Sequence, residues 1–246
     1  MLKRLFAMML VLFAATQTVN AGWDITGVIS AGKDAATAAT LSDEEVKILA
    51  QNASQQYDAS NQVAESSSPY AVRLAKITEG MQNEAGLQPE IKVYIKDEIN
   101  AFAMANGSIR VYSALMDQMT DDEIRYVIGH EIGHVNLGHT KKALQVAYAA
   151  SAGRKAAAAS GNSGAAALSG SELGALAENL VSAQFSQSQE RDADQYALKL
   201  MKQNHYDPKA AVSALRKLEK LFGNESSVFA SHPAPGERAN ALEKAL

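Results

Sequence analysis

The clearest periodic pattern in this chain of 246 residues lies between residues 120 and 136. Thr120 and, three residues later, Glu123 form a capping box, which predicts that a helix begins here. Apolar residues follow at helical spacing and form one stripe along the predicted helix: Ile124, Val127, Ile128 and Val135. Such a stripe is typical of a helix that packs against the rest of its domain.

Similar signals predict further helices. Residues 42–60 begin with a capping box, and another helix begins with Ser68 and Pro69, an N-cap followed by proline at the first helical position. Apolar residues on both sides of an acidic cluster predict one long helix over residues 173–201. The last helix is expected over residues 237–246.

Short strands are predicted between these helices. Residues 91–95 alternate between apolar and polar side chains, as a half-buried strand does. Residues 101–104 and 109–112 flank Asn106-Gly107, a strong hairpin-turn signal. We therefore expect a small antiparallel sheet beside the helix that begins after Thr120. The predicted fold class is α+β and mainly α-helical.

The composition suggests one domain with less regular flanks. Residues 42–246 are long enough for a single sizeable core, and residues 22–41 are expected to form a flexible arm. Residues 143–170 are rich in alanine, glycine and serine, which favours a mobile hairpin or lid. An ordinary disordered loop is the alternative for that segment.

The first 21 residues have the features of a secretory signal peptide. Lys3 and Arg4 precede an apolar run over residues 5–15, and a small-residue cleavage site ends at Ala21. The apolar run is shorter than the ~20 residues that span a membrane, although an uncleaved anchor is an alternative. We expect a protein that is secreted into the periplasm.

Net charge and cysteine content argue against nucleic-acid binding, disulfides and a lipid anchor. Cleavage after Ala21 moves the net charge from −4 to −6, which argues against nucleic acid, since binding to nucleic acid calls for a basic patch. The chain has no cysteine, so neither a disulfide nor a lipid anchor on cysteine can form. Any attachment to the outer membrane is expected to be peripheral, through protein contacts.

The most specific chemical motif is His130-Glu131-Ile132-Gly133-His134, an H-E-x-x-H sequence within the helix that is predicted to begin after Thr120. Histidines four residues apart lie on one helix face with Cβ atoms about 5–6 Å apart, so both can bind one zinc ion. Glu131 can then take a proton from the attacking water. The alternative is a surface helix that carries these residues by chance. Gly133 indicates close approach of another backbone or of substrate, or plain packing.

A catalytic zinc ion needs a third protein ligand. If the helix continued, His139 would point about 140° away from His134, so we expect it to lie at the helix end rather than on the metal. Glu190 is the better candidate, and Asp194 follows one turn later on the same helix face. Asp194 can accept the free ring N–H of a ligating histidine. The alternative is that Glu190 and Asp194 belong to a solvated acidic helix face and have no role at a metal site.

At this point the chain resembles the gluzincin metallopeptidases, the family that includes HtpX, BepA and the CAAX prenyl proteases. The resemblance extends from about residue 69 to 240, and its motifs are specific. It is carried by Asn100-Ala101-Phe102-Ala103, Gly107–Ser113, Val127–His134, Phe185–Asp194, and His232-Pro233 with Arg238. It implies a zincin-type metallopeptidase domain beside the predicted sheet.

The resemblance also implies roles for residues. One Zn²⁺ per chain is expected on His130, His134 and Glu190, with Glu131 as general base. His232 is expected near the zinc, either stabilising the oxyanion or blocking the open coordination position. Arg238 is expected to pair with a carboxylate of the site, or only to balance surface charge. Residues Asn100, Ala101, Phe102 and Ala103 are expected to bind substrate along a sheet edge.

We therefore expect a zinc endopeptidase that cleaves misfolded or unassembled polypeptides, such as outer-membrane proteins, in the bacterial cell envelope. The substrate class comes from the resemblance alone. Two alternatives stay open. The protein can be a periplasmic chaperone or assembly factor with a latent or silent site, or a groove closed at one end can make it an exopeptidase.

Overall fold

The computed structural model describes residues 41–81, 87–156, 168–223 and 231–246. The predicted signal peptide, nearly all of the predicted arm, and residues 157–167 of the predicted mobile segment lie outside these ranges. In chain order the elements are α2 (Asp43–Ser60), α3 (Pro69–Ile77), β1 (Glu90–Tyr94), β2 (Ala101–Ala103), β3 (Ser108–Tyr112), α4 (Ser113–Gln118), α5 (Asp121–Asn136), α6 (His139–Ala156), α7 (Gly170–Val181), α8 (Gln187–Gln203), α9 (Lys209–Phe222) and α10 (Pro235–Glu243). In the described ranges, no helix combines the length and apolarity required to cross a membrane.

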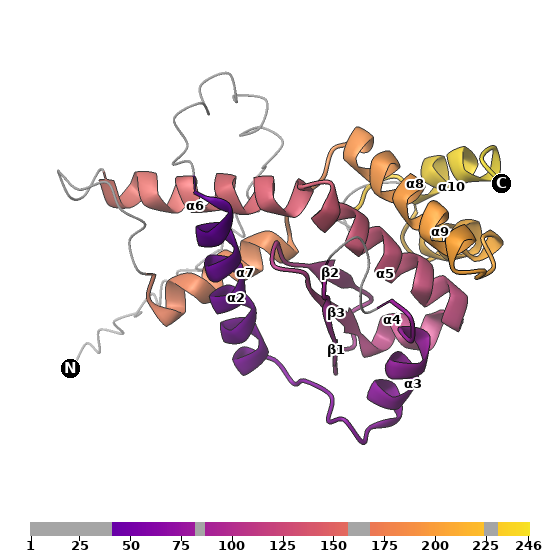
Figure 1. Cartoon of the computed structure of the whole chain (residues 1–246), viewed down its shortest axis with the longest axis horizontal. Coiled ribbons are helices and arrows are strands. Elements are labelled where there is room, and N and C mark those ends of the chain that lie inside the picture. The colour runs from indigo at the N-terminus through magenta and orange to yellow at the C-terminus, as the bar shows by residue number, and fades with distance from the viewer. Residues whose placement is uncertain (1–40, 82–86, 157–167, 224–230) are drawn as a thin grey trace, which may run out of the picture.

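The sheet lies in the middle of the molecule, between α2 and α5 (Figure 1). Helices α8, α9 and α10 gather on the far side of α5, whereas α6 and α7 extend away with α2. The chain is thus mainly helical with a small sheet, as the sequence predicts.

The direction of one strand differs from the prediction. The strand order is β1-β3-β2, and β2 and β3 form the expected antiparallel hairpin, but β1 pairs with β3 in parallel. The predicted wholly antiparallel sheet is therefore wrong, and the sheet is mixed. The turn at Asn106-Gly107 fixes β2 against β3 locally, whereas no tight turn joins β1 to either strand. All five residues of β3 are buried, which suits its central place.

Alternate side chains of the strands face the two sides of the sheet. Val93, Ala101, Ile109 and Val111 join the core that includes α5. Tyr94, Phe102 and Tyr112 face α2, where Tyr94 and Phe102 contact the Tyr57 ring in tilted and edge-on arrangements. Tyr112 stacks on Tyr94 and meets Phe102 edge-on. The sheet therefore separates an aliphatic core on the α5 side from an aromatic one on the α2 side.

Helix α5 begins as its capping box predicts. The backbone N–H of Thr120 donates to Glu123 Oε2 over 2.7 Å, and the Thr120 side chain accepts from the Glu123 N–H. Glu123 is buried and also accepts from Ser213 and Lys217 on α9, the latter over 2.6 Å. The cap thus fixes α9 against the start of α5.

One prediction about the helices needs correction. The predicted single helix over residues 173–201 is two helices, α7 and α8, because Ser186 and Gln189 form a new capping box that begins α8. In the segment 143–170, residues up to Ala156 belong to α6, and a mobile hairpin or lid there stays a prediction. Apolar spacing alone did not reveal the break before α8.

A buried ion pair ties α2 to the sheet. The Arg110 side chain is only 1% exposed, and its Nε and Nη2 atoms donate to Asp58 over 2.8 and 2.9 Å. Lys92 and Tyr94 also donate to Asp58. Burial alone would raise the pKa of Asp58, but these hydrogen bonds, led by that of Arg110, outweigh it and hold the pKa below its usual range.

We expect Arg110→Met to destabilise the protein by about 3 kcal/mol, because it leaves the Asp58 carboxylate without its main partner. A carboxyl whose pKa is lower when folded contributes stability that is present above its unfolded pKa, about 3.9, and is lost as the pH falls. The free energies of unfolding of wild type and variant, measured in urea, should therefore become more similar as the pH falls below about 4. A difference in unfolding free energy that does not change with pH would contradict the role of the Arg110–Asp58 ion pair. Lys92→Met is the milder control, since Lys92 is 35% exposed.

Candidate metal centre

The candidate site forms where α5 and α8 approach closely. Gly133 on α5 allows this approach, because a Cβ atom there would lie only 3.2 Å from the backbone of Ala193. Of the explanations offered for Gly133, the close approach of another backbone is thus the one observed. Glu190 and Asp194 are buried on the facing side of α8, so the approach brings their carboxylates to the H-E-x-x-H motif.

The ligand atoms of three residues lie at the spacing of a tetrahedral metal site. His130 Nε2 and His134 Nε2 are 3.0 Å apart. Glu190 Oε1 lies 3.3 Å from His134 Nε2, and its Oε2 lies 3.5 Å from His130 Nε2. Atoms bound at ~2.0–2.1 Å to one tetrahedral zinc ion are about 3.3 Å apart. The two nitrogens and the carboxylate of Glu190 therefore lie close to the spacing that a zinc site needs.

His232 supplies a fourth possible donor from the segment before α10. Its Nδ1 lies 3.3 Å from His130 Nε2 and 3.0 Å from Glu190 Oε1. One ligand atom from each of His130, His134, Glu190 and His232 falls within 4.8 Å of the others. All four side chains are buried. The late histidine is thus at the site, as the family resemblance implies.

His130 is oriented by an acidic hydrogen-bond network. Its Nδ1 lies 2.9 Å from Asp194 Oδ1, which also accepts from the Tyr126 hydroxyl over 2.6 Å. Arg238 reaches Asp194 through Nη2 over 2.6 Å and Glu190 through Nη1 over 2.7 Å. Asp194 and Arg238 thus lie where the sequence placed them. Tyr126 was missed, although it precedes His130 by four residues and so shares its helix face.

His134 has different neighbours. The Phe185 ring lies against it, with centroids 3.9 Å apart and planes inclined by 31°. His139 Nδ1 lies 3.1 Å from His134 Nδ1. The expectation that His139 marks the end of the helix is wrong, because α5 ends at Asn136 and His139 is the first residue of α6. Phe185 was overlooked as a site residue, although it begins one of the family-like segments.

Burial and neighbouring charges shift the pKa values of the site residues. Burial would raise the pKa of Glu190, but the charges of Arg238 and His232 and hydrogen bonds with the two other histidines hold it well below its usual range. Burial and Arg238 oppose protonation of His130, yet Asp194 and Glu190 outweigh them and raise its pKa to about 9. A proton must therefore leave His130 when a metal binds. Burial raises the pKa of Glu131, as suits a general base near neutral pH.

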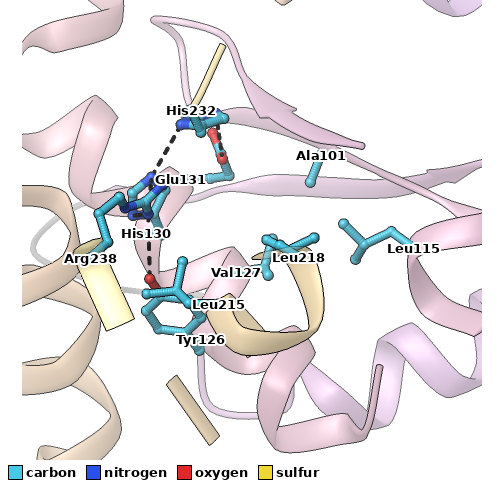
Figure 2. Close-up of a pocket in the computed structure, with 10 residues that line it drawn as sticks. All are labelled: Ala101, Leu115, Tyr126, Val127, His130, Glu131, Leu215, Leu218, His232 and Arg238. Carbon is cyan, nitrogen blue, oxygen red and sulfur yellow. Dashed lines mark hydrogen bonds and ion pairs between the residues drawn. The ribbon is translucent and has the colours of Figure 1, made fainter. Parts of the chain in front are cut away.

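A pocket opens beside these groups, with polar side chains on one side and apolar ones on the other (Figure 2). The space in it that water-sized molecules can enter is about 30 Å³. The polar side includes His130, Glu131, His232 and Arg238, together with Tyr126; the apolar wall consists of Ala101, Leu115, Val127, Leu215 and Leu218. Glu131 Oε1 lies 3.4 Å from His232 Nε2.

The predicted substrate-binding residues have different positions. Ala101 lines the pocket, and Ala103 lies on the same face of β2. The Phe102 side chain faces α2 on the opposite side of the sheet and so points away from the site. Asn100 is buried, and its carbonyl accepts from the Tyr112 N–H over 3.0 Å.

Comparison with known proteins agrees with this geometry. Residues 70–246 match the model of peptidase family M48. Metalloprotease LoiP of Escherichia coli is 45% identical over 89% of this chain and 87% of its own length, and metalloprotease YcaL of the same organism is 43% identical over 90% and 87%. The β-barrel assembly-enhancing protease of E. coli is 31% identical over 61% of this chain and 33% of its own length.

The family model covers most of the chain, and the two E. coli metalloproteases align over nearly its whole length. Their similarity includes the segment in which His130, His134 and Glu190 are brought together. The chain therefore belongs to peptidase family M48 and is a zinc metalloprotease.

Proposed function

We propose that this metalloprotease is an endopeptidase of the bacterial cell envelope that cleaves misfolded or unassembled proteins at one zinc ion per chain. The observation that carries the catalytic part is the tetrahedral spacing of His130, His134 and Glu190 next to Glu131. The signal-like first 21 residues support the compartment. The name of the β-barrel assembly-enhancing relative supports substrates among outer-membrane proteins.

In the proposed mechanism, His130, His134 and Glu190 hold the zinc ion. Zinc in such a site polarises the scissile carbonyl and acidifies water. Glu131 takes the proton of the attacking water and returns it to the leaving amine. Asp194 accepts the ring N–H of His130 and so keeps the other nitrogen free for the metal.

The edge of the sheet is the proposed docking site for the substrate backbone. β2 is an edge strand, and in the described ranges no strand pairs with its outer side. Tyr112 N–H donates to Asn100 and Met104 N–H donates to Ser108, so alternation turns the N–H and C=O groups of Ala101 and Ala103 outward. An extended peptide can pair with these groups with little sequence preference.

The pocket beside Glu131 is the proposed receptor for one substrate side chain. Glu131 gives its proton to the leaving nitrogen and also lines this pocket, so the side chain should belong to the residue after the scissile bond. The wall formed by Leu115, Val127 and Leu218 favours an apolar side chain, and the limited space favours a small one.

His232 is proposed to block the site reversibly in the described conformation. A catalytic zinc site keeps one position open, and His232 Nδ1, 3.0 Å from Glu190 Oε1 and 3.3 Å from His130 Nε2, would be close enough to take it. Stabilisation of the oxyanion, the other role considered, requires the ring to move aside and leave this position to substrate.

Glu131→Gln is expected to lower casein cleavage by about 10²–10⁴-fold while zinc stays bound, because the variant loses the proton acceptor but no proposed ligand. Proteolysis and zinc content should be measured together, with exposed Glu98→Gln as the control. Unchanged cleavage would rule out Glu131 as the base. A wild type that binds no zinc and cleaves nothing would favour the chaperone alternative, and only terminal cleavage of unblocked peptides would favour an exopeptidase.

His232→Ala is expected to increase cleavage of a short peptide at least about fivefold, because the open metal position is no longer occupied for part of the time. Steady-state rates at saturating zinc provide the measurement. A rate below that of the wild type would instead show that His232 stabilises the transition state.

Leu218→Ala is expected to widen the pocket and to raise the cleavage ratio of Phe over Leu, at the position after the scissile bond, about tenfold. The ratio of kcat/KM values for paired peptides measures this change. Leu198→Ala is the matched control, since Leu198 is buried in the same core and does not line the pocket. An equal shift in both variants would argue against the pocket.

A further inference from the structure

The two candidate histidine ligands are held in different ways. His130 turns its Nδ1 towards a carboxylate, Asp194. His134 turns its Nε2 towards the site, so its Nδ1 points away from the proposed metal. There the side chain of His139 approaches, with its own Nδ1 at 3.1 Å. Among the described residues, this is the polar side chain that the structure places at hydrogen-bond distance from that nitrogen.

The local backbone explains this contact. If α5 had continued, His139 would point about 140° away from His134. Instead α5 ends at Asn136, and Gly138 takes a positive φ of 74°, a conformation that favours glycine. The chain turns there and begins α6, so that the imidazole of His139 returns to the side of His134. The two ring centroids lie 5.1 Å apart, with planes inclined by 67°.

The hydrogen bond between the two rings requires one proton. A nitrogen that binds a metal carries no proton, so His134 must carry its proton on Nδ1 when Nε2 is the ligand atom. His134 Nδ1 is then the donor. His139 must accept with its own Nδ1, which places the proton of His139 on Nε2. The opposite arrangement would put the proton of His134 on the nitrogen that faces the metal.

The other face of His134 is also fixed. Phe185 lies against the ring at a centroid distance of 3.9 Å and limits its rotation. Phe185 carries no hydrogen-bonding group on its side chain, so it cannot select which nitrogen of His134 is protonated. Orientation and tautomer therefore depend on different neighbours, Phe185 and His139.

We propose that His139 is a positioning residue for the zinc site, which accepts the Nδ1 proton of His134 and thereby leaves Nε2 free for the metal. This proposal rests on the proposed zinc ligands. In this proposal the neutral imidazole of His139, on α6, accepts the ring proton of His134, as the carboxylate of Asp194 accepts that of His130. Such partners behind a metal ligand typically change metal affinity by about 10–100-fold when they are removed.

Zinc affinity, measured by competition with a chelator, tests the proposal on the full chain. His139→Leu removes the acceptor, and His139→Asn keeps an oxygen in the position of Nδ1. We expect zinc binding about 10–100-fold weaker in the leucine variant and within about threefold of wild type in the asparagine variant. Thr140→Val is the control, because the Thr140 hydroxyl is buried and has no hydrogen-bond partner among the described residues.

Equal affinity in the leucine variant and wild type would overturn the proposal, and so would equal weakening in the leucine and asparagine variants, which indicates packing alone. If the leucine variant does not fold, nitrogen NMR of the zinc-loaded wild type decides. A proton on Nδ1 of His134 and on Nε2 of His139 is expected, and the reverse would overturn the proposal. A wild type that binds no zinc would overturn the zinc site itself, whereas zinc-dependent cleavage with unchanged affinity in the leucine variant would overturn only the role of His139.

Discussion

The site depends on how closely α8 can approach α5. A Cβ atom at Gly133 would meet the backbone of Ala193 at 3.2 Å, and one at Gly129 would meet Ala197 at 3.4 Å. The second distance is an ordinary contact, so it is the absence of a side chain at Gly133 that lets the helices lie this close along the turn that carries the histidines. Because Glu190 projects from α8 at the same level, the third donor arrives from a distant part of the sequence. A larger residue at Gly133 would push the carboxylate away from both imidazoles.

The sheet and the helices of the site have separate tasks. One face of the sheet packs on α5, while the other is fixed to α2 by aromatic side chains and by the Arg110–Asp58 ion pair. These contacts fix the position of the edge strand β2 relative to Glu131. In the proposed mechanism, a substrate that pairs with β2 reaches the reacting groups without any need to order the strand first.

Much of this arrangement could be predicted from the sequence, because its signals are local. Capping boxes located the starts of α2 and α5, and helical spacing placed His130 and His134 on one face. Contacts between distant segments were harder to predict. The parallel pairing of β1 with β3 has no turn signal, and the position of His139 depends on a helix break at Gly138 that the argument from helical phase did not include. The ring of Phe185 reaches the site from the segment between α7 and α8, which was expected to be continuous helix.

Arg238 has a consequence for the protein without its metal. Its guanidinium pairs with both Glu190 and Asp194 and so offsets part of the repulsion between these two buried carboxylates. This attraction favours an arrangement in which Glu190 stays close to His130 and His134 whether or not an ion is bound. We expect that the metal ion can be removed from such a site and bound again. Exchange for cobalt or another divalent ion should need no unfolding, which makes this chain suited to metal-substitution spectroscopy.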